Sequence, residues 1–153
     1  KALLFLSAGS VIHALHHEQD MRNMGGLAKK MPITTILMWI GSLSIIGFPF
    51  FSGYYSKESI LITAYFTNSS IAMYAYIIGI LTALLTAFYS WRLLFMTFHG
   101  DTRVSNNIWI HVQESPKVMI IPLVILAVDL FFPAYFWQVF LLVLINKFFG
   151  IIL

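Results

Sequence analysis

Two adjacent charged residues within an apolar stretch are the strongest candidates for chemistry. Lys57 and Glu58 lie in the 34-residue apolar segment that runs from Ile33 to Phe66. A charged side chain near the centre of a bilayer costs at least about 2.5–3.5 kcal/mol, so it is rarely kept without a partner, a cavity or a function. Burial favours the neutral amine and a nearby carboxylate favours the ammonium, so a movable partner could switch a lysine between holding and releasing a proton. The pair predicts a proton- or ion-carrying site. A snorkelling Lys57 with Glu58 as its surface neighbour is an alternative that the residues alone leave open.

The same segment predicts an interrupted helix. As one straight helix it would measure about 51 Å, whereas the hydrocarbon core of a bilayer is about 30 Å thick. Gly47, Pro49 and Gly53 lie in its middle, where the proline removes a backbone donor and the glycines loosen the backbone. We therefore expect two half-helices joined near residues 47–53 at membrane depth, as in ion carriers whose helix ends meet buried charges.

Two further residues could take part in proton transfer. Lys1 begins the first apolar segment, and from the residues alone a snorkelling anchor is the favoured interpretation. His13 lies twelve residues further on, and imidazole suits a proton relay near neutral pH. A histidine that is hydrogen-bonded to a neighbouring helix is the simpler explanation of His13.

The composition excludes most soluble functions. Hydrophobic residues make up 59% of the 153 residues and charged residues only 10%, and the mean hydropathy is +0.85, whereas soluble chains are roughly 25% charged. The absence of cysteine excludes thiolate chemistry and cysteine-based metal sites. We find no Gly-rich phosphate loop, no metal-ligand spacing and no catalytic triad, so no metal or cofactor is expected on this chain. The net charge of +3 comes from a few residues near the ends of apolar runs, which excludes a nucleic-acid-binding stripe.

These observations predict an all-α fold, a polytopic transmembrane helical bundle with one discontinuous helix. We expect residues 1–153 to form a single membrane domain whose spans cover about 1–16, 33–66 (broken near 47–53), 71–98, 118–132 and 134–153, with Pro133 marking a hairpin or kink. Arg22, Lys29, Lys30, Arg103 and Lys117 then lie on one side, and the uncharged Thr67–Ser70 turn lies on the other. The positive-inside rule places the basic loops in the cytoplasm or the mitochondrial matrix.

Several long motifs resemble one known family. The chain resembles the C-terminal part of the largest antiporter-like membrane subunit of respiratory complex I, which is chain L of the bacterial NADH:quinone oxidoreductase or subunit five of mitochondrial NADH dehydrogenase. The resemblance covers about residues 1–127, and its motifs are Lys1–Leu6, Gly9–His13, Glu18–Leu27, Gly47–Pro49, Gly53–Leu61, Phe88–Arg92, Phe98–Gly100 and Glu114–Met119. Beyond about Val128 the sequence departs from the family pattern, and the earlier helices of the family are absent, so we expect a piece of a longer protein.

The resemblance implies roles that spacing alone does not. In this family the lysine that opens the Lys-Ala-Leu-Leu-Phe motif, Lys1 here, is a central member of the proton path. Lys57 matches the terminal lysine on the discontinuous helix, and Glu58 stands where the family carries Asp or Glu. The family couples quinone reduction in a distant arm to proton pumping along buried lysines and glutamates.

The resemblance also implies the surroundings of the chain. NADH and quinone would be used by the parent complex, and the partners would be other membrane-arm subunits and the lipid bilayer. The location would be the bacterial cytoplasmic membrane or the mitochondrial inner membrane. Two alternatives remain open at this point, namely the large subunit of a multi-subunit sodium/proton antiporter and a non-pumping truncated remnant.

Overall fold

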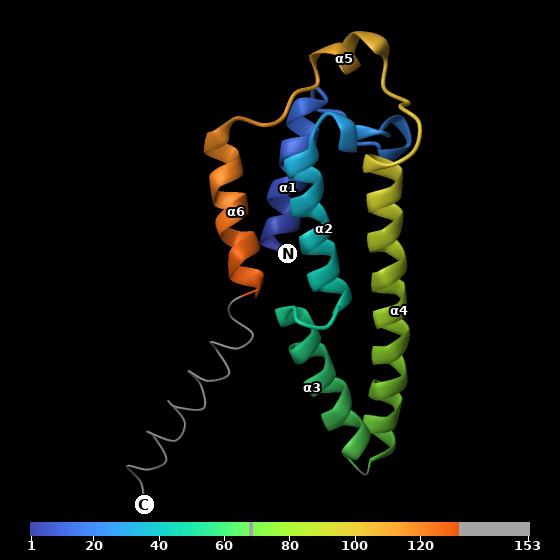
Figure 1. The fold of residues 1–153 in the computed structure, drawn as a ribbon. Coiled ribbons are helices and arrows are strands. Elements are labelled where there is room, and N and C mark those ends of the chain that lie inside the picture. Colours follow the sequence, from blue (N-terminus) through green and yellow to red (C-terminus); the bar gives the residue numbers. More distant parts are fainter. Residues whose placement is uncertain (68, 132–153) are drawn as a thin grey trace, which may run out of the picture.

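The computed structural model describes residues 1–67 and 69–131, and within these ranges its regular elements are all helices. They are α1 (Ala2–Ala14), α2 (Pro32–Ile46), α3 (Ser52–Phe66), α4 (Ser70–Phe98), α5 (Asn106–His111) and α6 (Lys117–Phe131), with short 3₁₀ helices η1 (Met21–Asn23) and η2 (Leu27–Lys29) (Figure 1). The predicted all-helical fold class is confirmed for the described residues. The span expected over 134–153 and the hairpin or kink expected at Pro133 lie outside them.

The ends of α2 follow from its sequence. Pro32 occupies the first position of the helix, where its fixed φ suits a helix and its missing N–H would have had no partner. The helix ends at Gly47, which adopts a left-handed conformation with φ of 90°. Its N–H donates to the carbonyl oxygen of Leu43 at 3.2 Å. Glycine is the residue that adopts this conformation most readily at a helix C-terminus.

The long helix α4 has no such break. Its 29 residues correspond to about 44 Å. Among the described residues it is the one helix that is long and apolar enough to cross a membrane, and none of its most apolar 18-residue window is buried. The bare apolar face of α4 therefore requires lipid or another protein to cover it.

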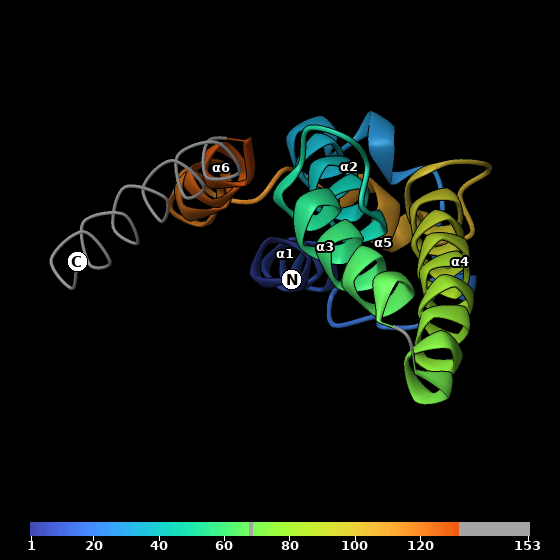
Figure 2. The same cartoon turned by 90° about the horizontal axis from the view of Figure 1, so that it is seen from below.

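The helix α2 lies at the centre of the structure. It packs against α1, α3, α4 and α6, and both views show it lying between α6 and α4 (Figures 1 and 2). One hydrophobic cluster joins α1, η2, α2 and α4 around Leu27, Met38 and Phe98. A second cluster joins α1, α2 and α6 through Leu3, Leu37 and Leu123.

The helices α2 and α3 follow one another along α4. Both pack against α4, so the break between them lies beside the middle of the long helix (Figure 1). The turn from α3 to α4 is at one end of the structure, and the segments 15–31 and 99–116 are together at the other end (Figure 1). All five basic residues expected on one side, Arg22, Lys29, Lys30, Arg103 and Lys117, belong to that second end or to the first residue of α6.

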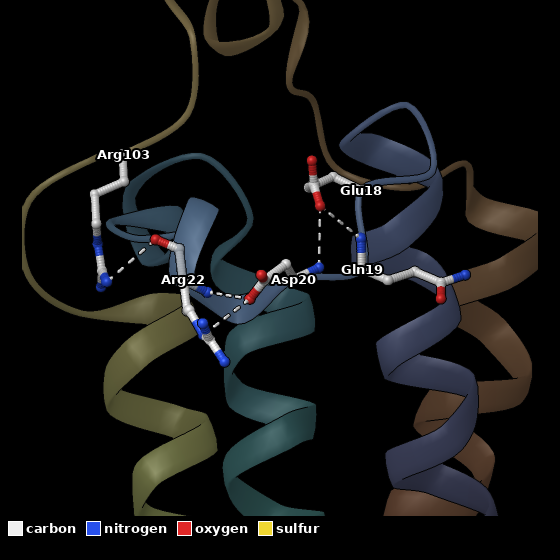
Figure 3. Close-up of polar contacts among 5 residues, drawn as sticks. All are labelled: Glu18, Gln19, Asp20, Arg22 and Arg103. Carbon is white, nitrogen blue, oxygen red and sulfur yellow. Dashed lines mark hydrogen bonds and ion pairs between the residues drawn. The ribbon is translucent and has the colours of Figure 1, made fainter.

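Local polar contacts organise the loops at the basic end. The Glu18 carboxylate accepts hydrogen bonds from the backbone N–H groups of Gln19 and Asp20, and the Asp20 carboxylate accepts one from Arg22 N–H at 2.9 Å. Arg103 donates from its guanidinium to the Arg22 carbonyl oxygen at 3.3 Å, which joins the two loops (Figure 3). The segment Glu18–Arg22, part of the motif Glu18–Leu27, therefore forms a loop held by local hydrogen bonds.

Two features differ from the sequence-based expectation. Residues 106–111 form the short helix α5, although the polar segment around them shows no apolar periodicity. Gly53 was expected within the break, but it lies in the first turn of α3.

Candidate functional site

The break between α2 and α3 comprises residues 47–51. Phe50 has a φ of 78°, which is unusual for a residue with a side chain and is typical of strained functional segments. Gly53 lets the helices cross closely, because a Cβ atom at this position would lie 1.9 Å from the carbonyl oxygen of Ser44 in α2. The start of α3 is thereby held directly against the last turns of α2.

Lys57 points from the second turn of α3 back to the end of α2. Its ammonium nitrogen lies 3.1 Å from the carbonyl oxygen of Ile46 and 3.5 Å from that of Ile45, and the side chain is partly buried. The last carbonyls of a helix have no partner within the helix and carry partial negative charge. Lys57 therefore supplies both hydrogen bonds and a compensating positive charge to the C-terminus of α2.

Glu58 has a different neighbour. The Tyr54 hydroxyl, one helical turn earlier, lies close to the Glu58 carboxylate. Within the described residues no ion pair joins Glu58 to Lys57, because side chains of consecutive helical residues point about 100° apart. The two charges of the motif thus have separate surroundings.

Lys1 borders a hollow between three helices. It immediately precedes α1 and is exposed. The hollow has a volume of about 320 Å³, and its polar lining includes Ser42 of α2 together with Tyr89 and Ser90 of α4. Lys1 and His13 lie at opposite ends of α1, about 18 Å apart along the helix. The structure therefore groups Gly47, Gly53 and Lys57 at one junction and leaves Lys1 and His13 apart from each other.

His13 lies at the other end of the bundle, in the last turn of α1. It is exposed and packs edge-to-face against His17, with 6.4 Å between the ring centroids. It also lines a hollow of about 430 Å³ together with His16, His111 and Glu114. Among the described residues, no hydrogen bond joins the His13 ring to a neighbouring helix, which was the simpler explanation of this histidine.

Glu114 is a site residue that sequence reasoning did not single out. Its carboxylate accepts hydrogen bonds from the backbone N–H groups of Ile33 and Thr34, both at 3.1 Å, and from the Thr34 hydroxyl. It thus caps the N-terminus of α2 from a loop about 80 residues away. A signal was present, because Met31 at the N-cap position provides no side-chain cap and some other acceptor had to satisfy the free N–H groups.

The next residue, Ser115, joins the same loop to α1. Its hydroxyl is hydrogen-bonded to the hydroxyl of Ser10, and both side chains are buried. The segment that carries Glu114 and Ser115 therefore holds α1 and α2 together at the basic end. Among the described residues no group of three or more histidine, aspartate or glutamate side chains is placed to hold a metal ion.

Comparisons with known proteins identify the family. A family profile described as "NADH:quinone oxidoreductase/Mrp antiporter, TM" matches residues 1–86. The chain belongs to this transmembrane family. The match includes Lys1, His13, Lys57, Glu58 and the whole break, whereas Glu114 lies outside it.

Individual relatives show which members of this antiporter-like family the chain resembles. The chain is 47% identical over 148 residues to NADH-quinone oxidoreductase subunit L of Rhodobacter capsulatus, covering 90% of the chain and 20% of that protein. It is 53% identical over 135 residues to NADH-ubiquinone oxidoreductase chain 5 of Dictyostelium citrinum, covering 88% of the chain and 20% of that protein. For chain 5 of Triticum aestivum the identity is 49%, with the same coverage. The chain spans about a fifth of the length of these relatives and is homologous to a subunit of this oxidoreductase.

Proposed function

We propose that the chain is the C-terminal part of an antiporter-like membrane subunit of NADH:quinone oxidoreductase and moves protons through Lys1, His13, Lys57 and Glu58. The similarity to subunit L and chain 5 supports the parent complex. In this proposal NADH and quinone react elsewhere in the complex, and this chain binds no cofactor. Its partners are the other membrane-arm subunits and the lipid bilayer, with no role for nucleic acid.

The contact between Lys57 and the end of α2 is the observation that carries the proposal. The ammonium group donates hydrogen bonds to the carbonyl oxygens of Ile45 and Ile46, at the break of the interrupted helix. A positive charge at a helix C-terminus gains about 0.3–1 kcal/mol, and up to about 2 kcal/mol when partly buried. The contact joins the two halves of the interrupted helix through a charged group, so movement of the end of α2 relative to α3 would break or remake it. In this proposal, proton transfer at Lys57 is linked to that movement.

The arrangement of the helices supports a polytopic membrane domain. With α4 spanning the bilayer, α2 and α3 together form one discontinuous span whose break lies near mid-depth, because the break lies beside the middle of α4 (Figure 1). The clustering of basic residues at one end agrees with the positive-inside rule. We place the chain in the bacterial cytoplasmic membrane or the mitochondrial inner membrane, as one multi-pass domain over residues 1–153.

Replacing Lys57 tests this proposal. In the full-length subunit, Lys57→Ala should lower the number of protons translocated per electron in NADH-driven membrane vesicles, with normal amounts of assembled subunit. Lys29→Ala is the matched control, because Lys29 is an exposed lysine of η2 outside the break. An unchanged proton-to-electron ratio in a normally assembled Lys57→Ala complex would reject the role of Lys57.

A sodium/proton antiporter subunit is a second candidate, because the family description includes the Mrp antiporter. The chain would then work without NADH or quinone. Purifying the protein with its neighbouring subunits separates the two candidates. A purified preparation that oxidises NADH favours the oxidoreductase. A preparation that exchanges sodium for protons without oxidising NADH favours the antiporter.

A further inference from the structure

The hollow beside His13 combines several titratable groups at the basic end of the bundle. Three imidazoles and one carboxylate line its volume of about 430 Å³. His13 comes from the last turn of α1, His16 from the turn that follows it, His111 from the end of α5, and Glu114 from the loop that precedes α6. Imidazole is the side chain that takes up and releases protons near neutral pH, and it can pass them between water molecules and neighbouring groups.

The carboxylate and one imidazole of the hollow are fixed in place. Three donors of Ile33 and Thr34 hold Glu114, which therefore presents a fixed acceptor charge among the histidines. His111 Nδ1 lies 2.8 Å from the carbonyl oxygen of Asn107. A carbonyl can only accept, so Nδ1 carries a hydrogen and Nε2 of the neutral ring is the position that binds a further proton.

A pair of buried hydroxyls adjoins the hollow. Ser115 lines it and shares a hydrogen bond with Ser10 of α1. Ser7 lies three residues from Ser10, and both side chains are fully buried. Residues at this spacing lie on the same face of a helix with their Cβ atoms about 5–6 Å apart.

Ser7 supplies an independent observation. Its hydroxyl is buried and has no hydrogen-bond partner in the described part of the chain. A buried hydroxyl without a partner costs about 1–3 kcal/mol and calls for an explanation. A water molecule between Ser7 and Ser10 would give the Ser7 hydroxyl a partner and extend the hydrogen-bonded row from the hollow along the buried face of α1.

We propose that this hollow is the mouth of a proton path. His13, His16 and His111 exchange protons with the water at the basic end, and the Ser115–Ser10–Ser7 row conducts them between the hollow and the buried face of α1. At each step an oxygen or nitrogen accepts one proton and releases another, so charge is conserved and no other reactant is needed. The inference rests on the proposed proton-moving function and adds the residues that connect it to one aqueous side.

Substituting the three histidines tests the mouth. The variant His13→Gln/His16→Gln/His111→Gln changes exposed side chains and retains polar groups, so the complex should assemble normally. In NADH-driven vesicles, its initial rate of proton translocation should fall by about tenfold at alkaline pH, where free protons are scarce, and much less at acidic pH. Added imidazole should restore the alkaline rate, which would not happen if the histidines only stabilised the fold.

A matched control is His99→Gln, because His99 is an exposed histidine at the end of α4 that does not line the hollow. An identical pH profile for the triple variant and for His99→Gln would overturn the proposed mouth. If the unaltered vesicles translocate no protons with NADH, or if Lys57→Ala changes nothing, it is the proposed function that fails. The two failures are therefore distinguishable.

The hydroxyl row has its own test. Ser7→Ala removes the unpartnered hydroxyl without adding volume, and it should slow translocation by about tenfold over the whole pH range while assembly stays normal. Thr82→Ala is the control, because Thr82 bonds only within its own helix, to the Ile78 carbonyl. Equal rates for Ser7→Ala and Thr82→Ala would exclude Ser7 from the path.

Discussion

Glu114 and Lys57 cap opposite ends of α2, the carboxylate at its N-terminus and the ammonium at its C-terminus. Each charge is opposite in sign to the partial charge at its end of the helix, so both contacts are favourable. Neither residue belongs to α2, since Glu114 comes from the loop before α6 and Lys57 from α3. The central helix is therefore held from outside at both ends, and each contact can be removed by a single substitution.

Removing the charge at Lys57 should loosen the last turn of α2. We expect Lys57→Met to weaken it by about 1 kcal/mol, because the carbonyls of Ile45 and Ile46 lose a charged donor that is only partly buried. Hydrogen exchange at the amides of Gly47 and Phe48, which both donate to the Leu43 carbonyl oxygen, should accelerate several-fold. Lys57→Arg keeps the charge and should exchange more slowly than Lys57→Met. Equal protection in unaltered and Lys57→Met protein would contradict the capping role.

The carboxylate at the other end can be tested in the same way. Glu114→Ala should cost about 1–2 kcal/mol of local stability, because the amides of Ile33 and Thr34 lose their acceptor. Hydrogen exchange at these two amides should accelerate by about 5- to 30-fold, since about 1.4 kcal/mol corresponds to a factor of ten. Glu114→Gln keeps an acceptor oxygen and should have the smaller effect. Gln113→Ala, at an exposed position next to it, should leave both amides protected.

Local sequence signals account for the helices and for the position of the break, but not for the contacts across the bundle. Gly47 and Pro49 mark where α2 stops, because a left-handed glycine and a proline are local features. The left-handed conformation of Phe50 has no such signal. From the sequence, Gly53 is predicted to lie in the break, as glycines often do. In the structure it is instead needed because the Ser44 carbonyl oxygen of α2 lies too close for a side chain. Glu114 reaches α2 across some 80 residues, a separation at which helix periodicity carries no information.

The close crossing at Gly53 should be sensitive to a single methyl group. In Gly53→Ala the new Cβ would lie 1.9 Å from the Ser44 carbonyl oxygen. Because this atom belongs to the backbone, α3 must move away at a cost of about 1–3 kcal/mol. The movement should separate Lys57 from Ile46 and lower proton translocation together with stability.

Gly9→Ala is the control, since a Cβ atom at Gly9 would meet nothing within 4 Å, and in a helix this change should be neutral or stabilising by about 0.5–1 kcal/mol. Identical translocation rates in the two variants would show that the close crossing is unimportant.

The contact between the two basic-end loops should depend on Gly25 more than on Gly100. Both have positive φ, 148° and 83° respectively, so alanine is strained at either position. A Cβ atom at Gly25 would also lie 2.3 Å from the Asp101 carbonyl oxygen, whereas one at Gly100 would meet nothing within 4 Å. Gly100→Ala should therefore cost only the conformational strain, about 1–2 kcal/mol, and Gly25→Ala should in addition push the 99–105 loop away from the 18–26 loop. Arg22 and Arg103 are already exposed, and Arg103 donates to the Arg22 carbonyl oxygen across this contact (Figure 3), so its loss should loosen the backbone around both arginines and let trypsin cut there. Limited proteolysis from the basic side should cut Gly25→Ala faster than Gly100→Ala, and equal cutting of the two variants would show that the loops are held by other contacts.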